Sequence, residues 1–224
     1  TSLSPLPLAG MTASNITVSA GGADAESDDR YRARIKLAPE AFSTAGPAES
    51  YRYWALSAHA TITDVEVHGP DVVVENGVLI SRNGVPPGVV EIYPLTMDGL
   101  PGDTVLDAVR IADRAEKRRP LCDLVDVRRP SVVNYAILAR AWLYRDADAD
   151  AVLAAMQAAA AAFVEARRMS LGRDIVPKQV SAALMVPGVY DIELLTPAAT
   201  VSVPRTAWSA CTSISIEVAG LADG

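Results

Sequence analysis

The sequence predicts an α+β protein in which a helical linker is followed by two small antiparallel-sheet α+β units. Three observations carry this prediction. Apolar residues recur at helical spacing in segment 47–58, they alternate with polar residues in segments 61–68 and 132–144, and an Asn-Gly pair separates two β-like runs within 72–81. We expect four parts along the chain: an N-terminal arm (1–26), the helical linker (27–60), a middle unit (61–130) with a hairpin insertion (71–85), and a C-terminal unit (131–224).

The chain is expected to begin with an arm and a well-capped helix. Residues 1–20 are rich in Pro, Ser and Thr and contain a short β-like run, so we expect an arm that needs a surface to lie against. Ser27 is placed to cap a helix over 27–38, and Asp28 and Asp29 fall in its first turn, where the helix dipole favours acids. The residues that share its apolar face are Tyr31, Ile35 and Ala38.

A second linker helix is predicted to begin at Gly46-Pro47, because proline is favourable at the first helical position. Its apolar stripe follows the spacing of one helix face and consists of Tyr51, Trp54, Ala55 and Ala58.

The middle unit is predicted to read strand, hairpin, strand, helix, strand. Segment 61–68 alternates cleanly, and Asn76-Gly77 suits the two positive-φ positions of a type I′ turn. The remaining expected elements are a strand at 88–95, a helix at 104–118 and a strand at 124–128.

The C-terminal unit is predicted to begin with a long strand whose alternate residues share one face. A 20-residue helix follows, and proline opens the second, shorter helix. The expected elements are strand 132–144, helices 149–168 and 177–185, and strands 190–194 and 212–218.

Composition sets limits on what the protein does. Half of the 224 residues are apolar and 21% are charged, which is typical of a globular chain. The net charge of −7 and the pI near 4.9 argue against a general nucleic-acid binder, which needs a basic face. We expect no membrane span, because the alanine-rich run at 151–164 is interrupted by Gln157 and is better read as a packed helix.

The sequence offers little catalytic chemistry. Cys122 and Cys211 are far apart and are read as reduced, mostly buried thiols, with a disulfide as the alternative. His59 and His68 have no cluster of further ligands at short spacing, which favours surface or capping roles over a metal site. Nucleotide-binding loops and nucleophile motifs are absent from the sequence. We therefore expect no catalytic residue, no metal site and no cofactor.

Two charged clusters have alternative readings. Asp146, Asp148 and Asp150 resemble the start of a calcium loop, but its glycine and glutamate positions are not filled, so we expect acids that cap the following helix. The basic clusters at 117–119 and 128–129 each precede a proline. We interpret them first as solvated charges at the ends of a helix and a strand. The alternatives are a docking patch for an acidic partner and a contact with nucleic acid.

Several motifs, taken in order, resemble the phage baseplate J-like family, the wedge proteins of contractile tails. The double glycine and acidic run at 21–30, followed by Gly46-Pro47, are similar to the central segment of that family. Segment 119–123 is similar to the family's Arg-Pro-Leu-Thr-Asp element, with Cys122 in place of the threonine. Further segments that resemble family signatures are 171–175, 186–189, 197–199 and 211–216.

This resemblance covers residues 21–218 and implies a structural role in assembly. It implies a subunit of the baseplate wedge with no catalytic residues to carry over. The implied partners are a tail protein I-like protein, a sheath-initiator-like wedge protein and copies of the chain itself, with no nucleic acid and no membrane. The implied location is the tail baseplate of the virion, and the host cytoplasm during assembly.

Two departures from the family are expected. Many relatives pass quickly from the first Gly-Pro to a Pro-Gly-Val-Val segment, whereas this chain inserts 71–85. The chain also starts without the further N-terminal segment that members usually carry. The sequence leaves open whether the particle is a true phage, a tailocin or an injection machine. Alternatives to the wedge are a free-standing protein-binding or regulatory module and, less favoured, a small-molecule enzyme.

Overall fold

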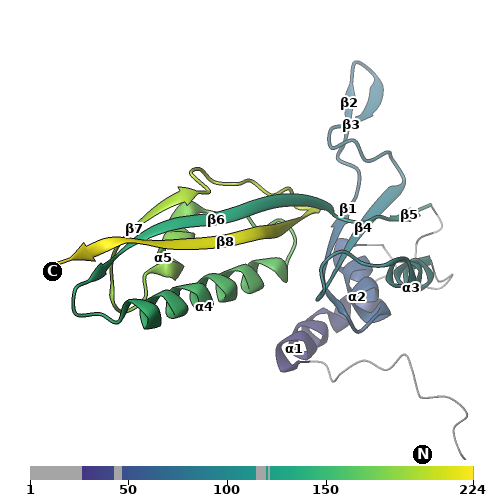
Figure 1. The fold of residues 1–224 in the computed structure, drawn as a ribbon. Coiled ribbons are helices and arrows are strands. Elements are labelled where there is room, and N and C mark those ends of the chain that lie inside the picture. The colour runs from purple at the N-terminus through teal and green to yellow at the C-terminus, as the bar shows by residue number, and fades with distance from the viewer. Residues whose placement is uncertain (1–26, 43–46, 115–119, 121, 224) are drawn as a thin grey trace, which may run out of the picture.

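The structure is a computed structural model that describes residues 27–42, 47–114, 120 and 122–223, in which two helix-covered sheets lie end to end and a hairpin projects from one of them (Figure 1). The α+β class is confirmed. The elements in chain order are α1 (Asp28–Leu37), η1 (Ala38–Phe42), α2 (Ala48–Ala58), β1 (Ile62–His68), β2 (Val72–Glu75), β3 (Val78–Ser81), β4 (Val89–Thr96), α3 (Asp103–Arg114), β5 (Leu124–Val127), β6 (Ser131–Tyr144), α4 (Ala149–Arg168), α5 (Pro177–Leu184), β7 (Val189–Thr196) and β8 (Ala207–Ala222).

The middle sheet has the strand order β1-β4-β5. β1 and β4 pair antiparallel, but β4 and β5 pair parallel, with Val89 opposite Leu124 and Ile92 opposite Val127. The prediction of a purely antiparallel sheet is therefore wrong here. The physical reason is that α3 lies between β4 and β5 in the chain and provides the crossover that parallel strands require.

The C-terminal sheet has the strand order β7-β6-β8. β6 pairs antiparallel with β7 and parallel with β8, so the antiparallel prediction is wrong for this pair as well. The chain between β6 and β8 passes through α4, α5 and β7, and this long return brings β8 back in the same direction as β6. β8 is 16 residues long, more than twice the strand predicted at 212–218.

Each sheet has its own hydrophobic core on its helical face. α2 and α3 cover the middle sheet, and the largest fully buried side chains there include Ile62, Ile92 and Val109. α2, which we placed in the helical linker, contributes Tyr51 and Ala55 to this core. The boundaries at 60 and 130 stay predictions. The second core lies between the C-terminal sheet and α4 and α5, and its buried members include Ile137, Ala139, Ala141, Leu143, Met156, Ile175, Val180 and Leu184.

α1 is capped as predicted but is packed differently. The Ser27 side chain accepts a hydrogen bond from the Arg30 backbone amide, and Asp28 and Asp29 lie in the first turn. The predicted apolar face is not buried, because Tyr31 and Ile35 are each 53% exposed. α1 is instead held by Arg30, whose guanidinium donates to the carbonyls of His59 and Ala60 beyond the end of α2.

α4 is the one described helix that is long and apolar enough to cross a membrane by length and composition. The expectation of no membrane span rested on Gln157, which does not lower the mean hydropathy enough to fail this test. α4 packs one side against the C-terminal sheet, where Val152, Met156 and Ala160 are buried.

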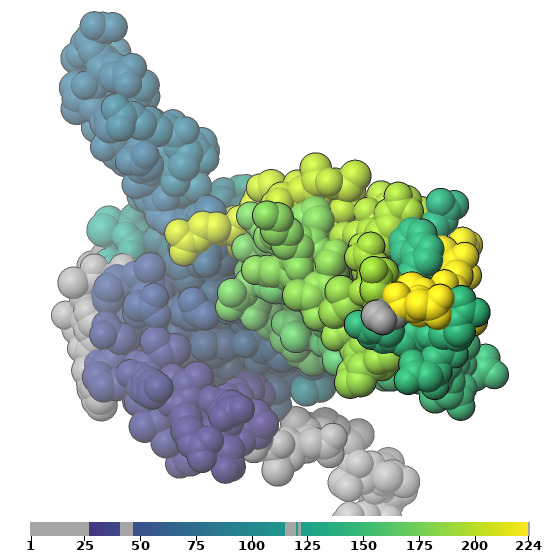
Figure 2. Space-filling model, turned by 90° about the vertical axis from the view of Figure 1, so that its left-hand side faces the viewer, coloured from purple at the N-terminus to yellow at the C-terminus, as the bar shows by residue number. Residues whose placement is uncertain are grey.

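The β2–β3 hairpin forms the predicted turn. Asn76 and Gly77 have φ values of 51° and 77°, as a type I′ turn requires. The two strands pair only with each other and project from the body (Figure 2). None of their eight residues is buried, and Val74 is 68% exposed. An isolated two-stranded hairpin is marginally stable in water, so these aliphatic side chains are suited to a contact outside the chain.

Candidate functional site

The candidate functional site is the joint at which the middle and C-terminal sheets meet. The covalent connection is short, since β5 ends at Val127 and β6 begins at Ser131. Pro130, within this connection, is buried. The relative position of the two sheets therefore depends on the contacts between them. These contacts join β1 and the turn after β4 to the end of α4, to the segment that follows it, and to the chain around the start of β8.

Asp64 of β1 is the central residue of the joint. One of its carboxylate oxygens accepts a hydrogen bond from the Leu171 backbone amide at 2.9 Å, across the joint. The other pairs with Arg52 of α2 at 2.8 Å. An ionised acceptor makes a stronger hydrogen bond than a neutral one, so Asp64 fixes the segment after α4 against the middle sheet.

A second contact joins the β4 turn to Trp208 of β8. A Cβ atom on Gly99, where φ is +106°, would lie 2.9 Å from the Trp208 ring. The indole nitrogen of Trp208 donates to the carbonyl of Arg168 at 2.9 Å, and the Arg168 guanidinium donates to the carbonyl of Met97 at 2.9 Å. The ring is thus held between the two sheets, and only glycine at position 99 leaves room for it.

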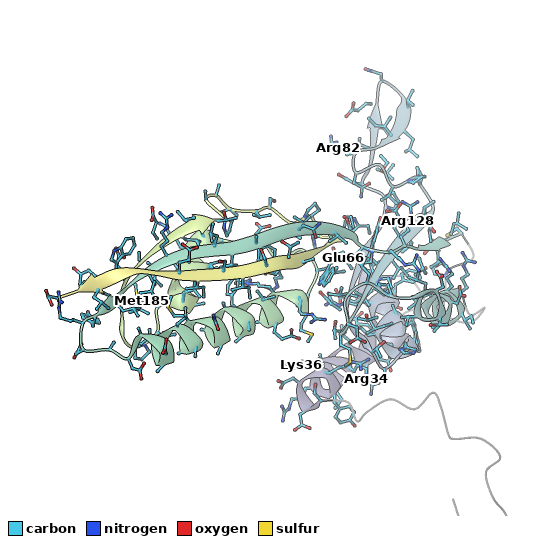
Figure 3. The ribbon with its side chains drawn as sticks, in the orientation of Figure 1. Arg34, Lys36, Glu66, Arg82, Arg128 and Met185 are labelled. Carbon is cyan, nitrogen blue, oxygen red and sulfur yellow. The ribbon has the colours of Figure 1, made fainter. Side chains whose placement is uncertain are left out.

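A polar network extends from the joint across the outer face of the middle sheet. Glu66 pairs with Arg205 at 2.9 Å and with His68 at 3.1 Å. On the neighbouring strands, buried Glu91 accepts a hydrogen bond from Tyr93 at 2.7 Å and pairs with Arg128 at 2.6 Å. Glu66 and Arg128, two members of this network, are labelled in Figure 3. The strand register, in which Glu66 lies opposite Tyr93, brings these groups onto one face.

The joint contains an open polar hollow of about 320 Å³. Its lining is charged with both signs, and each of its acids has a cationic partner in the contacts above. Within the described part of the chain, no group of three or more His, Cys, Asp or Glu residues is placed to hold a metal ion. The residues that line the hollow are Arg52, Asp64, Glu66, Ser170, Leu171, Gly172, Arg173 and Arg205. This arrangement is suited to holding two bodies together.

His59 has the capping position that the sequence predicts, whereas His68 is half-buried and paired with an acid rather than free on the surface. His59 is the C-terminal cap residue of α2, and its Nδ1 lies 2.8 Å from the Thr61 hydroxyl and accepts from the Thr61 amide. His68 pairs with Glu66 and contacts the edge of the Tyr93 ring. The structure does not bring the two histidines together in a common site.

The acidic run before α4 caps the helix, as predicted. The Asp148 carboxylate accepts from the backbone amides of Asp150 and Ala151 at 3.1 and 3.2 Å. Asp150 lies in the first turn of α4. Asp148 thus satisfies two amides that a helix start leaves without partners, and Asp150 lies where the helix dipole favours an acid.

One basic cluster is paired and the other lies outside the described residues. Arg128 pairs with Asp126 at 2.7 Å and with Glu91, and Arg129 pairs with Asp103 at 2.7 Å. They are charges at a strand end that already have acidic partners, which agrees with the first of the three readings. Residues 117–119 are not among the described residues.

The cysteines are both reduced, but their burial differs from the prediction. Cys122 is exposed and Cys211 is half-buried. The expectation of two mostly buried thiols is therefore wrong for Cys122, because it lies in the loop before the edge strand β5. Burial raises the pKa of the Cys211 thiol, and burial raises the pKa of the Tyr135 hydroxyl beside it. Burial, followed by the Glu91 carboxylate, also raises the pKa of Tyr93.

The joint residues could not be identified from the sequence as a site. Asp64 and Leu171 are 107 positions apart, and an acid in an alternating strand reads as a solvent-facing residue. A signal was nevertheless present in segment 171–175. Gly172 has a φ of +64°, and a Cβ there would lie 2.9 Å from the Arg205 backbone. Asp174 accepts from the Val203 amide at 2.7 Å, so this segment is shaped to hold the joint.

Comparisons with known proteins match both sheets. The family model described as the Baseplate J-like central domain matches residues 43–129, and the one described as the Baseplate J-like protein C-terminal domain matches residues 135–217. Among curated proteins, baseplate protein J of Escherichia phage P2 is 32% identical over 195 residues, which cover 87% of this chain and 60% of that protein. The chain thus spans about three-fifths of the length of this relative.

Among solved structures, the chain is similar to one in the baseplate of the anti-feeding prophage. The TM-score is 0.49 at 17% identity, and the match covers 81% of this chain and 40% of the other.

Proposed function

Because the chain belongs to the baseplate J-like family, we propose that it is a structural subunit of the baseplate wedge in a contractile phage tail or phage-like particle. The observation that carries this proposal is that the two J-like models match consecutive parts of the chain, 43–129 and 135–217, in that order. The named relative is a baseplate protein of a phage. We also propose that the chain divides into a middle unit at 61–130 and a C-terminal unit at 131–224; the gap between the two matches, from 129 to 135, supports the second of these boundaries.

The geometry supports an assembly role over a catalytic one. The polar side chains of the joint are engaged with one another across two bodies, as the Asp64–Leu171 and Glu66–Arg205 contacts illustrate. Aliphatic side chains are exposed on the projecting hairpin, where a partner can reach them. We propose that the protein is not an enzyme and acts through protein–protein contacts.

The proposed partners are other wedge proteins: a tail protein I-like protein, a sheath-initiator-like protein and copies of the chain. The proposed location is the tail baseplate, with the host cytoplasm as the site of assembly. Co-expression with the genes adjacent to its own, followed by electron microscopy, tests this. Wedge or ring particles that contain the chain are expected. A chain that stays apart from all its neighbours would contradict the proposal.

A second test concerns movement at the joint. Since the connection at 128–130 is short and the interface is polar, a change in baseplate state could reorient the two sheets about it. A cysteine pair at Asp64 and Leu171, in a C122S/C211S background, locks the joint when oxidised. Oxidised particles are expected to assemble but not to contract, and reduction is expected to restore contraction. Contraction unaffected by the lock would contradict movement at this joint.

A further inference from the structure

β8 presents a long strand edge without a partner in the described part of the chain. It pairs with β6 along one side and is the last strand of the order β7-β6-β8. Register shifts occur where β8 passes Thr212 and Ala219. Between them lies a regular run, 213–218, whose outward amide and carbonyl groups can template a further strand. A chain that exposes such an edge is suited to strand addition.

The two faces of this run differ in polarity. Ile214, Ile216 and Val218 lie opposite Ile137, Ala139 and Ala141 of β6 and thus point to the side of α4. Ile214 and Val218 are still 38% and 39% exposed, although they are on the core face. Ser213, Ser215 and Glu217 lie on the other face and are exposed. A strand with the same alternation, added at this edge, would complete the burial of these aliphatic side chains.

α4 lies beneath the same edge and has a compatible surface. It contacts β8 (Figure 1), and its outward positions are mostly alanine. Helices pack 8–10 Å apart depending on their side chains, and alanines allow the closest approach. The charges of α4 are near its ends, with Asp150 in the first turn and Glu165, Arg167 and Arg168 near the C-terminus, where Glu165 pairs with Arg168. The exposed alanines are Ala149, Ala151, Ala154, Ala155, Ala158, Ala161, Ala162 and Ala166.

We propose that segment 214–218 of β8 pairs antiparallel with the same segment of a second copy, related by a two-fold axis. The two sheets then become one continuous sheet, with the two α4 helices antiparallel and side by side on one face. A second copy fits because it supplies a strand of the right alternation together with a helix of small side chains. The antiparallel helices also place the acidic end of one beside the basic end of the other.

Several axis positions keep the faces matched, and we choose the one that pairs the half-exposed Ile214 and Val218 with each other. The helical face of one copy continues into the helical face of the other only when the two-fold axis lies at a residue, so that this residue pairs with itself in the second copy. Moving the pairing by one residue would set the helical face of one strand beside the opposite face of the other.

An axis at Ser215 also matches the faces, but it sets Val218 opposite Thr212, where the register with β6 shifts. An axis at Glu217 would set two carboxylates directly opposite each other, which is unfavourable. An axis at Ile216 sets Ile214 opposite Val218 of the second copy on the helical face. On the other face it sets Ser215 opposite Glu217 of the second copy.

The expected contact is of moderate size. A 20-residue helix is about 30 Å long, and a zone of that length and about 20 Å deep covers roughly 600 Å² per copy. This is the lower limit for stable interfaces, so the dimer is expected to dissociate on dilution. The proposal deepens the proposed function, since it names how copies of the chain meet.

Substitutions at the exposed Ser215 test the register with a matched control. Ser215→Glu places a carboxylate opposite Glu217 of the second copy at two symmetric sites and is expected to weaken the dimer about five-fold. Ser215→Lys, at the same position, is expected to retain or tighten it. Sedimentation of the 224-residue chain over a range of concentrations measures both. Equal dissociation constants for the two variants, or a wild-type chain that stays monomeric throughout, would overturn the proposal.

Disulfide cross-linking gives an independent test. Ile214→Cys with Val218→Cys, in a C122S/C211S background, is expected to give a covalent dimer on oxidation. Within one strand, residues four apart are separated by about 13 Å, beyond the reach of a disulfide. Each single variant is the control and is expected to stay uncrosslinked. Self-pairing would be refuted if the double variant dimerises in sedimentation but does not cross-link on oxidation. It would also be refuted if the β8 edge is covered only when another baseplate protein is added. Wedge formation, scored separately by microscopy, could still succeed.

Discussion

Replacing Asp64 by alanine is expected to loosen the joint between the two sheets. The Asp64 side chain is 17% exposed and holds the Leu171 amide at 2.9 Å and Arg52 at 2.8 Å. Loss of a charged acceptor from the Leu171 amide costs about 1.5–3 kcal/mol. Arg52 is 36% exposed and can be rehydrated, so its lost ion pair adds only about 0.2–1 kcal/mol. The expected loss of unfolding free energy is thus about 2–4 kcal/mol.

Thermal and chemical unfolding measure this loss, and hydrogen exchange of the Leu171 amide reports whether it arises at the joint. For a chain of this length, about 2–4 kcal/mol corresponds to roughly 4–16 °C in Tm. Asp107→Ala is the matched control, because it removes an equally charged but 63% exposed partner of Arg110. The control is expected to change stability by less than about 0.5 kcal/mol. Equal losses for both variants, or unchanged exchange at Leu171, would refute this account of the joint.

Three further predictions test other parts of the fold. Gly188→Ala is expected to destabilise the chain by about 2–4 kcal/mol in denaturant unfolding, because its φ is +96° and a Cβ would lie 2.5 Å from Val152. The control is Gly69→Ala, which should be nearly neutral because a Cβ there would meet nothing within 4 Å. Similar losses of unfolding free energy for the two variants would contradict this prediction. Cys122 should react with a thiol reagent at pH 7–8 faster than Cys211. Cys122 is exposed, whereas burial raises the pKa of Cys211 and keeps it protonated, and the protonated thiol is unreactive. The rates are measured one cysteine at a time in the C122S and C211S variants, and a faster reaction of Cys211 would contradict the prediction. Ser27→Ala should increase hydrogen exchange of the amides in the first turn of α1 and lower the unfolding free energy by about 0.5–2 kcal/mol, because the Ser27 hydroxyl accepts from the Arg30 backbone amide. Unchanged exchange in this turn would show that the cap is unimportant.

The sequence predicted local features well because their causes are local. The Ser27 and Asp148 caps, the Asn76-Gly77 turn and the order of helices and strands each depend on neighbours a few residues apart. The strand directions were wrong where direction depends on the path of the intervening chain, as for β5 and β8. The apolar face of α1 was wrong for a related reason: periodicity reveals a face but not what covers it.

The joint could not be predicted, because its contacts join residues 71 or more positions apart and several involve backbone atoms. Leu171 contributes an amide, which every residue but proline has, and Asp64 reads as one of many solvent-facing acids. What the sequence does carry is the geometry that makes these contacts possible. Gly99 leaves room for Trp208, and Gly172 leaves room for the Arg205 backbone.

This explains how motifs without catalytic chemistry can still be recognisable. Two of the segments that resemble family signatures contain a positive-φ glycine in close contact with another part of the chain, Gly172 in 171–175 and Gly188 in 186–189. A side chain at either position would shift a backbone or a core residue, so these motifs specify shape. A subunit whose motifs specify shape acts by presenting surfaces at fixed positions. Its exposed edges and faces, above all segment 213–218 with the adjoining alanines of α4, are therefore where its function should be sought.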